Sequence, residues 1–108
     1  MTGTASQIQW AEQIRPRVDA EFERVASAFR GAASDQTKQK RAETLAVLGI
    51  LEEKRREVMA NDRAGYYIRD WQELTDQVRR TIAADARYRE IKSRREMRRH
   101  AKSQDLNV

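Results

Sequence analysis

Few side chains in this chain of 108 residues could carry out acid–base or nucleophilic chemistry. Cysteine is absent, which excludes thiolate nucleophiles, thiolate zinc sites and disulfides. The one histidine, His100, stands among arginines and lysines, where no pocket is expected to position a general base. We therefore predict a protein that is not an enzyme and that needs neither a metal nor a cofactor.

Paired carboxylates do occur, for example Glu52 with Glu53 and Glu53 with Glu57. The second pair shares a helical face, but the cationic residues 54–56 surround it, which is typical of a solvated, salt-linked helix surface. A di-metal carboxylate bundle would need Glu-x-x-His pairs, and the sequence has none. It also lacks a glycine-rich phosphate loop.

A cationic segment near the end of the sequence offers binding chemistry instead. Residues 1–86 contain 14 Lys and Arg and 14 Asp and Glu, whereas residues 87–102 contain eight cations and two acids. This segment therefore accounts for the net charge of +5. Guanidinium groups present planar donors that suit carboxylate or phosphate oxygens. The predicted partner-binding residues are Arg87, Arg89, Lys92, Arg94, Arg95, Arg98, Arg99 and Lys102.

Three interpretations of this segment stay open at the level of sequence. It could bind an acidic protein surface or a nucleoprotein complex, it could bind nucleic acid with low sequence specificity, or it could be a solvated tail. A membrane surface is disfavoured, because Ile91 and Met97 are the only large aliphatic residues in the segment. No apolar run is long enough to cross a bilayer, so we predict a cytoplasmic protein.

The spacing of apolar residues predicts an all-α protein. We expect a first helix from Ser6, where Ser6 and Gln9 have the spacing of a capping box, to Gly31. Pro16 interrupts the helix but not the phase of its apolar stripe, which predicts a kink rather than two helices. The apolar stripe of this helix comprises Ile8, Ala11, Ile14, Val18, Phe22, Val25 and Phe29.

A second helix is predicted after a cap at Ser34 or Asp35, ending near Ala60. Its middle turns, residues 45–51, are apolar nearly all round, which indicates burial from more than one side. Gly49 would then admit the close approach of a neighbouring helix. The same turn could instead be buried in a dimer, which would make this a structural or oligomerisation domain. The oligomeric state is left open.

A third helix is predicted from about residue 63 to residue 101, and the three helices together predict an antiparallel three-helix bundle. The third helix would end in a basic arm that projects from the bundle. We expect a disordered N-terminus at residues 1–5, the bundle at 6–86, the arm at 87–102 and a disordered tail at 103–108. The predicted structural core includes Trp71, Tyr67, Leu48, Leu51, Leu74, Val78 and Ile82. Trp10 is expected to pack at the edge of this core.

Two short blocks carry a resemblance. Residues 7–15, Gln-Ile-Gln-Trp-Ala-Glu-Gln-Ile-Arg, resemble a Gln-Ile-x-Trp-Ala-Glu-x-Ile-Arg block of small phage- or plasmid-borne bacterial proteins. Residues 64–68, Ala-Gly-Tyr-Tyr-Ile, are similar to a second block of those proteins. The resemblance implies a mobile-element context, a packing of Trp10 against Tyr66 and Tyr67, and a host-defence inhibitor of anti-CRISPR type that binds a protein or nucleoprotein complex.

Overall fold

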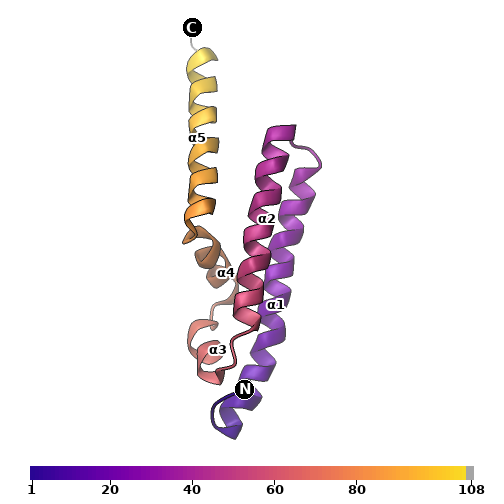
Figure 1. Cartoon of the computed structure of the whole chain (residues 1–108), viewed down its shortest axis with the longest axis vertical. Coiled ribbons are helices and arrows are strands. Elements are labelled where there is room, and N and C mark those ends of the chain that lie inside the picture. Colours follow the sequence, from indigo (N-terminus) through magenta and orange to yellow (C-terminus); the bar gives the residue numbers. More distant parts are fainter. Residues whose placement is uncertain (107–108) are drawn as a thin grey trace.

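The computed structural model describes the backbone of residues 1–106 and the side chains of residues 1–101. This part of the chain is helical and elongated, with extents of 66 × 22 × 17 Å (Figure 1). The helices are α1 (Ala5–Ala33), α2 (Lys38–Met59), α3 (Ala64–Asp70), α4 (Leu74–Ala83) and α5 (Ala86–Leu106). The all-α prediction is therefore confirmed, although the number and order of the helices differ from the expected bundle.

Helix α1 begins at a capping box two residues earlier than expected. The Thr4 hydroxyl accepts a hydrogen bond from the Gln7 backbone N–H, and the Gln7 side chain accepts one from the Thr4 backbone N–H. Both bonds satisfy donors that a helix start leaves without partners. Pro16 lies inside α1 without dividing it into two helices, and the kink stays a prediction. The helix passes through Gly31 and ends at Ala33.

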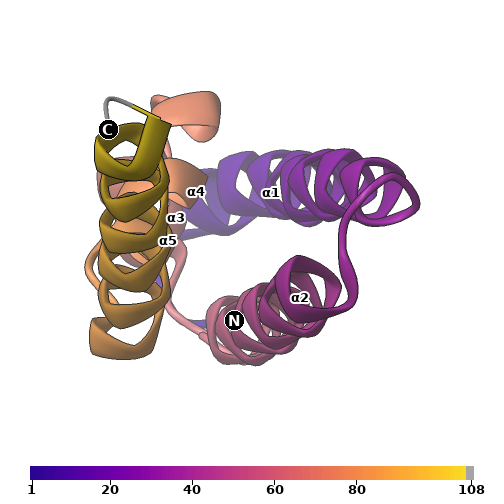
Figure 2. The same ribbon diagram turned by 90° about the horizontal axis from the view of Figure 1, so that it is seen from above.

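Helices α1 and α2 form an antiparallel hairpin around the main apolar core (Figures 1 and 2). Helix α2 is capped by Thr37 rather than by Ser34 or Asp35, through a bond from the Lys40 backbone N–H to the Thr37 hydroxyl. The guanidinium of Arg55 then joins the two helices through Asp19, at 3.1 Å. The hairpin contributes most of the buried side chains: Ala11, Val18, Phe22, Val47, Ile50, Leu51 and Val58.

The apolar turn of α2 at residues 45–51 is buried on one side only. Val47, Ile50 and Leu51 enter the core, whereas Leu45 is 59% exposed and Gly49 faces solvent. A Cβ built on Gly49 would meet no atom within 4 Å, so no helix approaches closely there. The expectation of burial from more than one side is wrong for the single chain. Coverage of this turn by a second copy stays a prediction.

The predicted long third helix is wrong, because breaks at residues 71–73 and 84–85 divide it into α3, α4 and α5. Helix α3 packs on α1, α4 packs on both α1 and α2, and α5 lies against α2. One straight helix cannot follow both surfaces, so tertiary packing overrides the continuous helical pattern. Tyr67 anchors the first of these segments: its buried hydroxyl donates to the Val58 carbonyl at 2.6 Å and lies 2.9 Å from the Asn61 carbonyl.

The predicted core residues lie at the centre of this arrangement. Trp71, Tyr67, Leu51, Val78 and Ile82 are buried. Leu48 and Leu74 are half-buried and pack against the same cluster. Trp71 contacts Phe22 with 5.8 Å between ring centroids, which ties the break after α3 to the middle of α1.

The ring contact of Trp10 with Tyr66 and Tyr67 that the resemblance implies is not found in the described part of the chain. The two tyrosines contact each other edge to face, with 5.2 Å between ring centroids. Trp10 is 54% exposed and is not among the residues that pack against the core cluster, so the expectation that it packs at the core edge is wrong.

The first residues, where the sequence predicts disorder, pair through their backbone with the segment before α3. Thr2 donates its backbone N–H to the Asp62 carbonyl at 2.7 Å and accepts one from Ala64 at 2.9 Å. Gly3 follows with a φ of +142°, and a Cβ there would come within 3.0 Å of the Ala64 side chain. Glycine is therefore needed where the chain turns from this backbone pairing into α1.

Candidate anion-binding groove

The basic arm does not project freely, because the described part of α5 lies along α2. Arg87 contacts Glu53 at 2.8 Å and Arg95 contacts Glu43 at 3.2 Å, so the two helices run antiparallel. Figure 1 shows α5 rising beside α2 and passing the end of the hairpin. The expectation of an arm in solvent after residue 86 is therefore wrong for its α2-facing side. Helix α5 continues to Leu106, beyond the predicted arm, and residues 107–108 of the predicted tail lie outside the described residues.

One face of α5 is directed at α2. Ile91 is buried in the core, Tyr88 is half-buried, and Arg95 and Arg98 follow at helical steps of four and three residues. The core stripe thus continues past Ile91 with arginines instead of aliphatic residues. The long arginine side chains bridge to α2 while their charged ends meet polar partners.

Glu43 is the acidic partner of this arginine pair. Its Oε1 accepts from Arg95 Nε at 3.2 Å, and its two oxygens accept from both terminal nitrogens of Arg98. The Glu43 side chain is only 11% exposed. The hydrogen bonds from Arg98 and then Arg95 hold the pKa of Glu43 below its usual value, and they outweigh the opposing effect of burial. Glu43, Arg95 and Arg98 therefore form a preorganised, ionised clamp between α2 and α5.

Thr44, the next residue, connects the clamp to the α1–α2 connection. Its hydroxyl is fully buried, accepts from Arg95 Nη2 at 2.9 Å and donates to the Gln36 side-chain oxygen at 2.6 Å. Arg95 Nη2 also donates to the Lys40 carbonyl at 3.0 Å. Within the described part of the chain Arg95 is held by Glu43, Thr44 and the Lys40 carbonyl, and its Nη1 has no partner there. Arg95 and Arg98 are consequently held in fixed positions relative to the start of α2.

The start of α5 is held in a similar way. Asp85 precedes α5 and accepts from the Arg87 backbone N–H at 2.9 Å, as an N-cap residue does. The Arg87 guanidinium reaches both Asp85, at 2.9 Å, and Glu53. These bonds lower the pKa of Asp85 and raise that of Arg87. An aspartate directly after Ala83-Ala84 is the sequence signal that could have revealed a new helix start.

The predicted partner-binding residues therefore separate into two groups. Arg87, Arg95 and Arg98 are engaged with acidic residues of the chain itself. The side chain of Lys102 lies outside the described residues. The remaining cations are exposed and make no ion pair within the described part of the chain: Arg89, Lys92, Arg94 and Arg99.

A groove of about 600 Å³ opens where α5 passes the start of α2. Four cationic side chains line it against the single carboxylate of Glu43 behind them, so the groove is strongly positive. Sequence reasoning identified the α5 residues but missed those of α2, since nothing in the sequence shows that the segments meet. The lining residues are Gln36, Thr37, Lys40, Arg95, Arg98 and Arg99.

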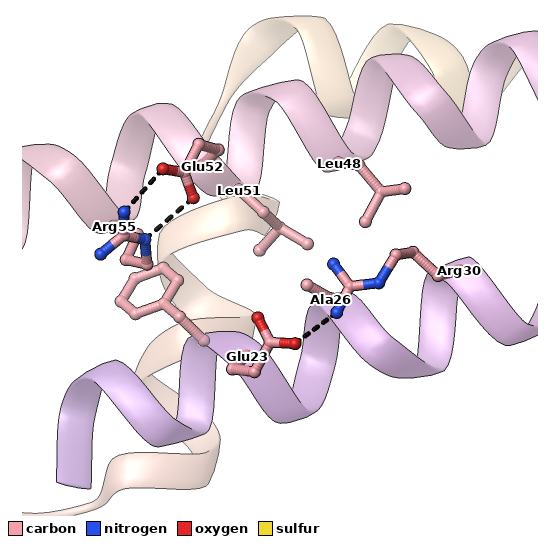
Figure 3. Close-up of a pocket in the computed structure, with 8 residues that line it drawn as sticks. Glu23, Ala26, Arg30, Leu48, Leu51, Glu52 and Arg55 are labelled. Carbon is pink, nitrogen blue, oxygen red and sulfur yellow. Dashed lines mark hydrogen bonds and ion pairs between the residues drawn. The ribbon is translucent and has the colours of Figure 1, made fainter. Parts of the chain in front are cut away.

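A second hollow, between α1 and α2, has a different character (Figure 3). It encloses about 230 Å³ over an apolar floor that includes Leu48 and Leu51. At its rim Glu23 pairs with Arg30, and Glu52 pairs with Arg55, whose hydrogen bonds lower the pKa of Glu52 to about 2. The two acidic and two basic side chains of this hollow pair with each other, so it carries no excess charge.

The face of α5 turned away from α2 carries a shallow hollow of about 420 Å³ lined by Ser93, Glu96, Met97, His100 and Ala101. Met97 is 68% exposed there. The exposed Arg89, four residues before Ser93, lies on this same face of the helix. Lys92, Arg94 and Arg99 are exposed on the flanks, between this face and the side that borders α2.

Neither a metal site nor a helix that could cross a membrane is found among the described residues. Within the described side chains, no three acidic or histidine residues lie close enough together to hold a metal ion. None of the described helices has an apolar stretch sufficient to span a bilayer. Comparisons with protein-family models, with curated proteins and with solved structures give no significant match for this chain.

Proposed function

We propose that this chain is a non-catalytic interaction protein that engages an acidic protein surface or a nucleoprotein complex through exposed cations of α5. These residues, Arg89, Lys92 and Arg94, are called the cationic border. The observation that carries the proposal is the excess of positive charge along this border. Arg89, Lys92 and Arg94 are exposed without an ion pair in the described part of the chain, and further along α5 a groove is lined by four cations. Such a surface attracts anionic partners and speeds their association.

The biological setting that we propose is supported by the resemblance of residues 7–15 and 64–68 to small phage- or plasmid-borne proteins. The role we propose there is inhibition of a host defence system, as anti-CRISPR proteins do. In this role the α1–α2 hairpin is the scaffold. It presents α5, and the acidic residues Glu43 and Glu53 fix the helix in place.

The second candidate function is binding of nucleic acid with low sequence specificity. Arginine forks suit phosphate oxygens, and Lys92 and Arg99 lie seven residues apart on one edge of α5, as contacts to a regular backbone would require. Affinity in this case falls steeply with salt and varies little among duplex sequences.

A charge-neutralised variant tests the proposed function. Arg89→Gln, Lys92→Gln and Arg94→Gln together remove three exposed cations without touching the ion pairs that hold α5. Fluorescence anisotropy would measure binding to a labelled polyglutamate peptide and to a labelled DNA duplex across a range of salt concentrations. We expect the variant to lose at least tenfold in affinity for the favoured probe, which corresponds to about 1.4 kcal/mol or more.

The matched control neutralises three exposed arginines outside α5, with Arg17→Gln, Arg63→Gln and Arg79→Gln. It has the same net charge as the test variant, and we expect near-native binding from it. Equal losses in the two variants would show that only overall charge matters and would contradict the proposal. Binding of the duplex without binding of the peptide would favour the second candidate.

Deletion of α5 is a poor test, because it removes Ile91 and Tyr88 from the core cluster. A truncated chain could lose binding simply because it unfolds. Point substitutions on the exposed border avoid this problem.

A further inference from the structure

The groove between the start of α2 and α5 has more donors than the fold itself uses. Glu43 occupies the two terminal nitrogens of Arg98 and the Nε of Arg95, and Thr44 and the Lys40 carbonyl occupy Nη2 of Arg95. Among the described residues, Arg95 Nη1 and Arg98 Nε have no hydrogen-bond partner. The side chains of Lys40 and Arg99 make no ion pair with any described residue. Four cationic side chains from two helices therefore line the same groove, and they have N–H donors that no described residue of the chain uses.

These donors are already positioned before any ligand arrives. The Glu43 clamp and the buried Thr44 hydroxyl fix the two inner arginines, which are 26% and 33% exposed. Preorganised guanidinium groups lose little side-chain freedom when an oxyanion binds. The outer pair, Lys40 and Arg99, is exposed and lines the same groove. The groove thus combines two fixed inner arginines with two exposed outer cations.

The size and charge of the groove select the class of anion. A single carboxylate would compete with Glu43 for the same guanidinium forks and would carry only one charge. A volume of about 600 Å³ exceeds what one small oxyanion fills. Consecutive phosphate groups offer several acceptor oxygens and more than one negative charge, which matches donors that converge from both helices. We propose that this groove binds a ligand with two or more linked phosphate groups.

This inference goes beyond the proposed function, because it assigns a defined small-anion site to residues that the exposed border of α5 does not include. Two sources could supply the phosphates: a free polyphosphate or nucleotide, or the backbone of a nucleic-acid strand. Both present the same chemistry to Lys40 and Arg99.

Isothermal titration of the full chain with inorganic tripolyphosphate, and separately with a short oligothymidylate, tests the site. The variant Lys40→Gln with Arg99→Gln removes the two outer cations without breaking a clamp bond. We expect at least tenfold weaker binding of tripolyphosphate, since each removed cation deletes a charge-assisted contact. The control Arg17→Gln with Arg63→Gln removes two exposed cations outside α5, has the same net charge and should bind as the native chain does.

The outcomes separate the two sources and the two proposals. Binding of both probes, with the oligonucleotide displaced by tripolyphosphate, supports a general phosphate site. Binding of the oligonucleotide alone supports a strand backbone as the source. The inference is overturned if neither probe binds at low salt, or if the Lys40 and Arg99 variant and its control lose affinity equally. Loss of polyglutamate binding in the Arg89, Lys92 and Arg94 variant is independent of all these results.

Discussion

The Glu43 clamp provides a quantitative test of how α5 is held. Glu43→Gln keeps the size of the side chain but removes the charge that accepts three hydrogen bonds from Arg95 and Arg98. A charge-assisted hydrogen bond contributes about 1.5–3 kcal/mol when it is buried, whereas exposed ion pairs contribute about 0–1 kcal/mol. The clamp lies between these limits, because Glu43 is 11% and Arg98 is 33% exposed. We expect a loss of about 1.5 kcal/mol in the free energy of unfolding.

Urea and thermal unfolding, followed by far-UV circular dichroism, measure this loss. For a domain of this size, 1.5 kcal/mol lowers the Tm by roughly 6–12 °C. The matched control is Glu90→Gln, which removes an exposed carboxylate of α5 that has no ion pair within the described residues. A double-mutant cycle with Arg98→Gln isolates the interaction between Glu43 and Arg98, and we expect a coupling energy of about 1 kcal/mol. Equal effects of Glu43→Gln and Glu90→Gln would refute the reasoning.

The pH dependence provides a second readout of the same clamp. The pKa of Glu43 in the folded chain lies below its usual value of 4.5. Its contribution to stability is therefore present above pH 4.5 and is lost as the pH falls through the folded-state pKa. The difference in stability between the native chain and Glu43→Gln should shrink over that interval. A difference that stays constant to the lowest measurable pH would show that the carboxylate charge is not responsible.

Three further substitutions test the fold by the same unfolding measurements. Thr4→Ala should cost about 1 kcal/mol through loss of the helix cap, whereas Ser6→Ala should be close to neutral; the reverse order would restore the sequence-based start of α1. Gly49→Ala should stabilise the chain by about 0.5–1 kcal/mol, because the position is helical and open; destabilisation would indicate a covering partner. Tyr67→Phe should cost about 0.5–1.5 kcal/mol, since it removes the buried hydrogen bond to the Val58 carbonyl, which keeps the Asn61 N–H as a donor; a cost below that of a surface substitution would contradict this role.

Much of the helical content could be read from the sequence, but the path of the chain after residue 70 could not. The stripe from Tyr67 to Ile82 has a continuous helical period, whereas the structure breaks near Trp71 and Asp85, where the chain passes from α1 towards α2. The α5 half of the groove was predicted through Arg95, Arg98 and Arg99. Its α2 half was not, because Lys40 and Glu43 are ordinary charged residues of an amphipathic helix until α5 is placed beside them.

By itself, the sequence determined that the chain is helical and that its excess charge resides in residues 87–102, because periodicity and composition are local properties. It also indicated that Trp71 and Tyr67 belong to the core. Only the tertiary structure decided which cations are available, because an arginine is committed or exposed according to the element opposite it. Glu43 and Glu53 of α2 engage Arg95, Arg98 and Arg87, and the cations that remain define the border and the groove.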